Sequence, residues 1–319
     1  MKFLDIGTKS TVYGDGVHDD TKALQECLDE LRDGGTLFFP DGTYLLSGAL
    51  IFYSHQNLIF SDHAVLRRSD KSDPITKYLL ASYSEPTWAD YDGTHDVTIT
   101  GGIFDGNENL TEYMTIVNTV HCKNITIRNC TFIHCAGWHC IEINGTDHAV
   151  IENCVFDGPS YTALRPDLSN ELIQFDASIH GSYGPVYDYA HNLIDFCSDA
   201  TVCRNCVVRN CLFKCDGFPG VGHHGNHDHH NIEICNNLFI GRIDRFDHSR
   251  GFVIFMEKAY GIHVHDNVFA SRSETGTAAL GLVINNPSPD AMIAENNVFD
   301  GWFAQVFKGG ITEKGNTMQ

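Results

Sequence analysis

A short phrase that ends in phenylalanine recurs seven times between residues 100 and 299. Its phenylalanines are spaced 28, 24, 57, 26, 30 and 30 residues apart. They are Phe104, Phe132, Phe156, Phe213, Phe239, Phe269 and Phe299. A repeat of this length without helical periodicity is typical of a solenoid. We therefore expect an all-β chain whose coils stack as a parallel β-helix.

The N-terminal segment follows a different pattern. Asp19-Asp20-Thr21 precedes apolar residues at helical spacing, and Asp33-Gly34-Gly35 ends the pattern. This predicts an amphipathic helix with an acidic N-cap. The open end of a solenoid exposes unpaired strand edges, so we expect this helix to cap it.

The stretch from Gly14 to Thr21, continued by Phe39-Pro40-Asp41-Gly42-Thr43-Tyr44, resembles the start of pectate-lyase-like right-handed parallel β-helix proteins. The resemblance implies one right-handed β-helix domain over residues 1–319. Residues 1–50 would form the cap and first strands, and residues 51–319 the coils. Glycoside hydrolases, polysaccharide lyases, epimerases and phage tailspikes share this fold, so it does not define the reaction.

The bulk properties restrict the possible partners. The formal net charge of −20 argues against nucleic acid and, less strongly, against polyanionic glycans. The first residues have no signal-peptide pattern, and no apolar run is long enough to span a membrane. We expect a cytoplasmic protein, or a secreted one whose leader has been removed. The twelve cysteines are then reduced and mostly buried.

Two positions of the repeated phrase predict structural ladders. Asparagine stands three residues before the phenylalanine in most repeats, with Asp266 as a substitute. Asparagine tolerates the left-handed backbone conformation, so we expect a stacked turn. Cys130, Cys154 and Cys211 stand two residues before the phenylalanine and are expected to pack in the core.

One coil is twice as long as its neighbours. The excess lies at about residues 177–197, which are rich in Gly, Tyr, His and Asp. Long loops in compact proteins are usually functional or disordered. The tyrosines, Tyr183 among them, favour a functional loop, because aromatic rings stack on sugars.

The strand after each phrase shows where chemistry is expected. In Cys140–Asn144 and Leu172–Asp176, apolar and polar residues alternate. Period two places the apolar residues inside and the polar residues outside. The next coil contributes Val221–Gly225. The outer wall is therefore predicted to carry two ladders of polar residues. They end after this coil, because the next two coils place Ile254 and Val283 at the same position. The ladders are Glu142–Gln174–His223 and Asn144–Asp176.

Glu142 and Asp176 would lie on a diagonal of this wall, with their Cβ atoms roughly 8 Å apart. Paired carboxyls at about 5–5.5 Å suit retaining glycosidases, and those at about 6.5–9.5 Å suit inverting ones. The alignment does not separate the two. We expect a polar groove here, flanked by the long insertion.

A narrower resemblance concerns Glu171–Asp176 and Ser198–Cys203. These runs are similar to a pattern in β-helix glycosidases such as the lacto-N-biosidase family of gut bacteria. The resemblance implies that Asp176 and Asp199 are the catalytic acid and the nucleophile or base. The insertion separates the two here, so Asp188 and Asp195 compete with Asp199. Glu171 would then contact substrate.

Several other residues are candidates for the groove. The cluster from Gly222 to His230 is expected to offer sugar-binding groups or, alternatively, a metal site. Trp138 and His139 lie at the rim, and Trp138 could be a sugar platform. The complete set of predicted substrate-binding residues is Gln174, Glu171, His223, His224, Asp228, Trp138, His139, Tyr183 and Asn144.

We therefore expect a glycoside hydrolase acting on a neutral or weakly charged oligosaccharide, with no cofactor and no metal. The alternatives are a polysaccharide lyase or epimerase acting on uronates, with Ca²⁺ and with Arg245 and Arg250 opposite the substrate carboxylate, and a non-catalytic carbohydrate-binding solenoid. No membrane or nucleic-acid partner is expected. The C-terminal coil, Phe303 to Gln319, has no evident cap and could mediate oligomerisation.

Overall fold

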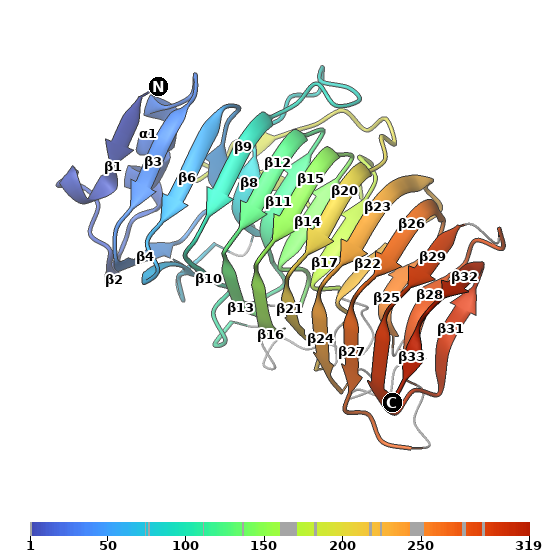
Figure 1. The fold of residues 1–319 in the computed structure, drawn as a ribbon. Helices are drawn as coiled ribbons and strands as arrows, with labels where there is room; N and C mark the ends of the chain where they lie inside the picture. The colour runs from blue at the N-terminus through green and yellow to red at the C-terminus, as the bar shows by residue number, and fades with distance from the viewer. Residues whose placement is uncertain are drawn as a thin grey trace.

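The computed structural model describes residues 2–319 except 74, 76, 111, 136, 160–170, 182–183, 217–218, 224, 243–251, 276–278 and 289–290. Its strands form three long parallel sheets. Figure 1 shows the coils following one another, with the two termini at opposite ends of the stack. The predicted all-β solenoid is confirmed, and its architecture is a parallel β-helix.

Each complete coil contributes one strand to each sheet. The first sheet contains β1 Phe3–Asp5, β3 Gly35–Phe39, β6 Gln56–Phe60, β9 His95–Thr100, β12 Lys123–Arg128, β15 Asp147–Glu152, β20 Arg204–Arg209, β23 His229–Cys235, β26 Ala259–His265, β29 Met292–Glu295 and β32 Ile311–Lys314. The second contains β2 Asp15–Asp19, β4 Gly42–Leu46, β7 Ala64–Arg68, β10 Ile103–Asp105, β13 Thr131–Cys135, β16 Val155–Pro159, β21 Leu212–Lys214, β24 Leu238–Gly241, β27 Val268–Ser271, β30 Val298–Gly301 and β33 Thr317–Met318.

The third sheet is the one that carries the predicted polar ladders. It contains β5 Leu50–Phe52, β8 Tyr78–Ser82, β11 Thr115–Val120, β14 Ile141–Asn144, β17 Ile173–Asp176, β22 Val221–His223, β25 Phe252–Met256, β28 Leu280–Ile284 and β31 Gln305–Gly309. A small antiparallel pair, β18 Val186–Tyr187 and β19 Leu193–Ile194, lies within the long insertion.

A single α-helix, α1 Thr21–Glu30, is described, together with the short 3-10 helix η1 Ile6–Thr8. In chain order α1 follows β2, where later coils place a strand of the third sheet. The Gln25 amide accepts the Ile51 N–H at 2.7 Å and donates to its carbonyl at 3.0 Å, so the helix pairs with the edge strand β5. Asp20 makes no side-chain cap; Asp19 instead accepts the Thr21 N–H. Within the described residues, no helix is both long and apolar enough to cross a membrane.

The predicted turn ladder is confirmed. Each ladder residue lies between a strand of the first sheet and one of the second, with φ between 52° and 56°. The ladder residues are Asn129, Asn153, Asn210, Asn236, Asp266 and Asn296. The left-handed residue redirects the chain at the same place in each of these six consecutive coils, so they remain in register.

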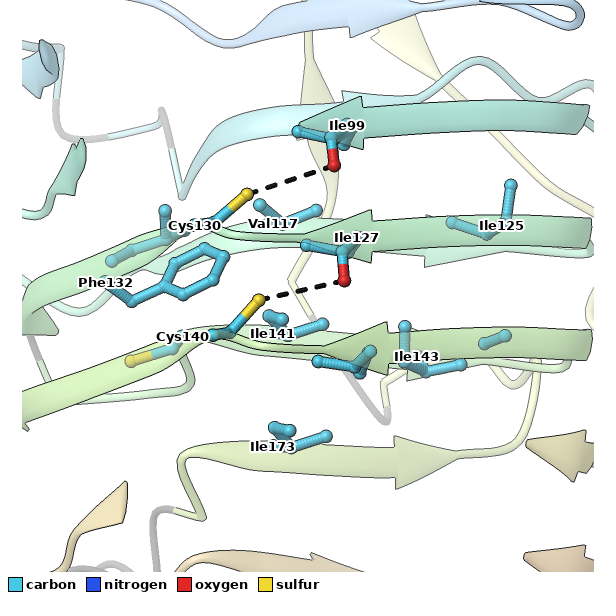
Figure 2. Close-up of a cluster of buried hydrophobic side chains, with 14 of the residues drawn as sticks. Ile99, Val117, Ile125, Ile127, Cys130, Phe132, Cys140, Ile141, Ile143 and Ile173 are labelled. Carbon is cyan, nitrogen blue, oxygen red and sulfur yellow. Dashed lines mark hydrogen bonds between the residues drawn. The ribbon is translucent and has the colours of Figure 1, made fainter. Parts of the chain in front are cut away.

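The repeated phenylalanines form one stack inside the solenoid. Neighbouring rings from Phe104 to Phe299 lie 4.5–5.2 Å apart. The cysteines beside them are buried and free, as predicted. Figure 2 shows the Cys130 thiol directed at the Ile99 carbonyl of the preceding coil, among buried isoleucines. Packing of these inward side chains is the main source of stability for such a coil.

In the later coils the cysteine position is taken by asparagine. Asn237, Asn267, Asn297 and Asn316 form a continuous ladder in which each amide oxygen accepts from the backbone and side-chain N–H groups of the preceding member. Their amide nitrogens also donate to main-chain carbonyls, as Asn297 does to Val264. The ladder therefore satisfies buried polar groups that would otherwise be unpaired.

We predict that Asn297→Ala lowers the free energy of unfolding by about 2–4 kcal/mol, because it leaves several buried donors and acceptors unpaired. Its neighbour provides a matched control. Asn296→Gly should cost less than about 1 kcal/mol, because glycine adopts the left-handed conformation readily. Urea unfolding followed by circular dichroism would measure both, and equal losses would contradict the structural role of the ladder.

Candidate functional site

The third sheet confirms the predicted relation between β14 and β17. Glu142 pairs with Gln174 and Asn144 with Asp176. Between them, the isoleucines of β14 and Phe175 of β17 are buried in the core. Glu142 and Asp176 therefore occupy the predicted diagonal, one coil step and one two-residue strand step apart.

The third member of the first ladder differs from the prediction. Gly222, not His223, pairs with Gln174, so the expected alignment is wrong by one residue. The next coil correspondingly places Phe255, not Ile254, beside Gly222. The Glu171 side chain lies over Gly222, where a Cβ would meet it. A carboxyl thus continues the row, but it is supplied by the residue that precedes β17.

A shift of one residue in strand register turns a side chain to the opposite face of the sheet. The His223 side chain therefore faces inward rather than outward. It is fully buried, and its Nδ1–H donates to the Phe175 carbonyl at 3.1 Å. Its ring packs edge-on against that of His229, with centroids 4.0 Å apart. In this conformation His223 cannot bind a sugar directly, contrary to its predicted role.

The polar wall is buried rather than open. Glu142 is 2% and Asp176 3% exposed, and Gln174 and Asn144 are buried with them. The predicted solvent-lined groove at these residues is therefore wrong for this conformation. We name these four residues, together with Glu171, the acid cluster.

Part of the cover comes from the long insertion, which folds back over earlier coils. The Tyr78 hydroxyl donates to the Gly184 carbonyl at 2.8 Å. Trp138 lies against Gly184 and stacks on Tyr113 in a nearly parallel arrangement, with centroids 6.1 Å apart. Trp138 and Tyr113 are half-buried, so part of each ring faces solvent. These aromatic residues form a rim beside the acid cluster.

Burial changes the acidity of both central carboxyls. Loss of solvation, reinforced by the nearby Asp176, raises the pKa of Glu142 to about 8. Burial likewise raises the pKa of Asp176 to about 7. Glu142 accepts weak hydrogen bonds from Thr115 at 3.2 Å and Asn118 at 3.3 Å, which oppose the shift. At neutral pH Glu142 therefore holds a proton, and Asp176 is close to its midpoint.

The remaining members orient these acids. Gln174 donates to Asp176 Oδ2 at 3.1 Å, and the Ala177 N–H donates to Oδ1 at 2.7 Å. His139 donates through Nδ1 to the Glu171 carbonyl at 2.6 Å, which holds the residue leading into β17. Among the described residues, the Asn144 amide has a hydrogen-bond partner at neither its nitrogen nor its oxygen, although it is fully buried.

Asp176, His223 and His229 form a candidate set of metal ligands. Ligand atoms of Asp176, His223 and His229 all lie within 4.8 Å of one another. However, His229 Nδ1 accepts the Cys203 N–H at 3.0 Å, and burial lowers the pKa of His229 well below its usual range. The ring is therefore neutral with its proton on Nε2, which leaves no lone pair there for a metal. In this arrangement the three residues do not suit a metal ion.

The other predicted acids lie outside the cluster. Asp199 is partly exposed, accepts from the Thr201 and Asp90 N–H groups, and has a lowered pKa because of these bonds. Its partners are those of a turn residue. Asp188 accepts from backbone N–H groups within the insertion, at Ala190 for example.

Two further predicted acids form surface pairs. Asp195 pairs with His180, and Asp228 pairs with Lys258 at 3.2 Å. The remaining predicted positions lie outside the described residues: Tyr183, His224, Arg245 and Arg250.

Several residues around the acid cluster were absent from the prediction. Asn118 pairs with Glu142 one coil earlier, so extending the ladder toward the N-terminus would have found it. Thr115 donates to Glu142 through its hydroxyl, and burial, reinforced by the nearby Glu142, raises the pKa of Tyr78 well above its ordinary value. No repeat pattern in the sequence indicates these two contacts.

The fold and the outer face of the third sheet define a β-helix protein with a buried acid pair. A model of the family described as rhamnogalacturonase A/epimerase, pectate lyase-like, matches residues 5–211. The chain therefore belongs to this pectate-lyase-like family, as the sequence resemblance implied.

The relatives of the chain carry different functional names. It is 26% identical over 256 residues to plasmin and fibronectin-binding protein A of Streptococcus pneumoniae, which covers 71% of this chain and 34% of that protein. It is 32% identical over 99 residues to "Probable endo-xylogalacturonan hydrolase A" of Aspergillus flavus, which covers 30% of this chain and 23% of that protein. The chain thus spans about a third or less of these curated relatives.

Solved structures with the same fold include both a binding protein and an enzyme. The pneumococcal surface adhesin PfbA superposes with a TM-score of 0.70 at 20% identity, over 99% of this chain and 77% of that one. An exopolygalacturonase from Thermotoga maritima superposes with a TM-score of 0.66 at 15% identity, over 99% and 81%. At these identities the likeness shows the fold alone.

We predict that stability falls as the pH rises through the range in which the buried acids ionise. Glu142 and Asp176 keep their protons in the folded chain, whereas in the unfolded chain they lose them near their ordinary values of 4.5 and 3.8. Their stabilising effect is therefore complete below about pH 4 and is lost as the pH rises through about 7 and 8. Denaturant unfolding at pH 4 to 9 would measure it.

Glu142→Gln should flatten this dependence and, at pH 8, exceed the wild type in stability by an amount on the order of a few kcal/mol. Asp199→Asn is the control: because Asp199 has a lowered pKa, its replacement should carry a cost that is constant between pH 5 and 9. An unchanged pH profile in Glu142→Gln would contradict the assigned protonation.

Proposed function

We propose that the protein is a glycoside hydrolase in which Glu142 is the general acid and Asp176 is the nucleophile or base. The observation that carries the proposal is the pair of buried carboxyls on neighbouring coils, both with raised pKa. Two carboxyls with separated proton affinities are what glycosidic bond cleavage requires. The protonated member donates to the leaving oxygen, and its ionised partner attacks the anomeric carbon or activates water.

The surroundings of the pair also suit a sugar. Asn144 offers a buried amide that can both donate and accept, and a sugar hydroxyl matches both functions. Trp138 and Tyr113 offer partly exposed ring faces at the rim, which can pack on a pyranose. The strongly negative chain favours a neutral or weakly charged glycan over a polyuronate.

Substrate access requires a conformational step. Both acids are nearly inaccessible, and the Tyr78–Gly184 hydrogen bond joins the insertion to the sheet above them. We infer that substrate binding displaces this part of the insertion and exposes the acids. Closure over the bound sugar would then exclude water from the reacting bond.

The test is a screen of nitrophenyl glycosides and oligosaccharides with the wild type and two isosteric variants. Asp176→Asn and Glu142→Gln should each lower kcat by roughly 10²–10⁴-fold or more with little change in fold, because each loses a proton-transfer group. Asp300→Asn, which alters an exposed ion pair with Arg272, should retain wild-type activity. Full activity in either acid variant would remove the assignment.

A second candidate function is non-catalytic binding. It is favoured by the alignment with the plasmin and fibronectin-binding protein, which spans 71% of this chain. In that case the acid variants would bind glycan or protein as the wild type does, and no substrate in the screen would be turned over.

A lyase acting on uronates is distinguished by its products. Elimination gives an unsaturated uronate that absorbs in the near ultraviolet, and hydrolysis does not. We expect no such absorbance, and activity that persists after chelation of Ca²⁺. Activity on polygalacturonate that depends on Ca²⁺ would favour the lyase.

A further inference from the structure

The outer face of the first sheet carries a second cluster of metal-binding side chains, remote in the fold from the acid cluster of the third sheet. Glu233 and Cys235 are two residues apart on β23, on the side opposite the core residues Ile232 and Ile234; Glu233 is half-buried and Cys235 is buried. His263 and His265 stand opposite them on β26, because the strands pair Glu233 with His263 and Cys235 with His265. The regular stacking of coils thus gathers a carboxylate, a thiol and two imidazoles at adjacent lattice positions.

The donor atoms of three of these residues converge on one point. His265 Nε2 lies 3.1 Å from Glu233 Oε1, and Cys235 Sγ lies 3.3 Å from the same oxygen. All three ligand atoms lie within 4.8 Å of one another. Zinc bonds of about 2.0–2.3 Å in tetrahedral geometry place ligand atoms about 3.3–3.7 Å apart, so only small side-chain movements are needed.

Two protons lie between the ligand atoms of this cluster, at the position where a metal ion would bind. Glu233 Oε1 can only accept, so the hydrogens of Cys235 Sγ and His265 Nε2 both point toward it. One divalent ion can replace these two protons without changing the charge of the cluster, and it supplies the bond that joins all three ligands.

A neighbouring carboxylate orients the histidine. His265 donates through Nδ1 to Asp266 Oδ2 at 2.8 Å, which directs Nε2 toward Glu233 and Cys235. A carboxylate behind a ligating imidazole is the usual outer partner of metal-binding histidines. His263 lies beside His265, with ring centroids 4.2 Å apart, and its Nε2 contacts Glu295 of the next coil at 3.2 Å.

From this arrangement we propose that Glu233, Cys235 and His265 form a Zn²⁺ site on the outer face of the first sheet. Sulfur, nitrogen and oxygen ligands together select zinc over calcium or magnesium. We expect water as the fourth ligand, because His263 Nε2 is paired with Glu295. The ion joins β23 to β26 and so bridges two consecutive coils in the C-terminal half of the solenoid.

A second group on the first sheet, several strands from the proposed site, serves as a matched control. His55 and His95 both face Asp96 Oδ2, at 3.5 and 3.0 Å, and their ligand atoms also lie within 4.8 Å of one another. That group is well exposed and contains no thiol. Metal binding at this group would measure the weak affinity expected of any pair of surface histidines beside a carboxylate.

The experiment is a Co²⁺ titration of the reduced 319-residue chain, followed by displacement with Zn²⁺. We expect one ion per chain, a tetrahedral visible spectrum and a thiolate-to-cobalt charge-transfer band. Cys235→Ser should abolish that band, and His265→Gln should weaken binding at least about tenfold, whereas Asp266→Asn should weaken it by about 10–100-fold. His95→Gln should leave the affinity unchanged.

Circular dichroism of the metal-free variants checks that each one folds. Glu233→Gln, which replaces the carboxylate ligand, provides a further variant. Zn²⁺ should raise the Tm of the wild type with increasing free ion, and it should not raise that of Cys235→Ser. The proposal is overturned if the wild type gives no charge-transfer band. It is equally overturned if the band survives in Cys235→Ser, or if affinity is unchanged in His265→Gln.

Discussion

Hydrogen bonding between consecutive coils in constant register is the constraint on which the rest of this structure depends. The left-handed residue at Asn129 and its equivalents turns six consecutive coils at the same point, and the Phe104–Phe299 stack fills the space inside that turn. Because the register does not drift, side chains far apart in sequence are held at fixed lattice positions. A site in such a protein is a property of the lattice rather than of any one loop.

The acid cluster and the proposed zinc site use this lattice in different ways. Glu142 and Asp176 lie beneath covering segments, and the resulting loss of solvation keeps one or both protonated near neutrality. Glu233 and His265 are partly open to solvent on the first sheet, and the buried Cys235 thiol lies directly beside them. The same spacing between coils thus produces a proton-transfer pair on one sheet and a ligand set on another.

The sequence predicted those features that repeat from coil to coil. The turn asparagines, the cysteine ladder and the pairing of Glu142 with Gln174 all follow from periodicity. His223 was misplaced because its glycine-rich strand lacks the alternation that fixes register, and a single-residue shift reverses the face. The burial of the acids was missed because contacts such as Tyr78 with Gly184 join segments with no common pattern.

The insertion also changes how the solenoid is expected to unfold. In a simple repeat protein each coil touches only its neighbours, so the ends can fray one coil at a time. Here Asp188 pairs with Ala49, His191 with Asp73, and the Cys197 carbonyl accepts from His121. These contacts tie a segment that follows β17 to coils near the N-terminus. The N-terminal half should therefore unfold as one cooperative block, whereas coils beyond the tie behave as a nearest-neighbour chain.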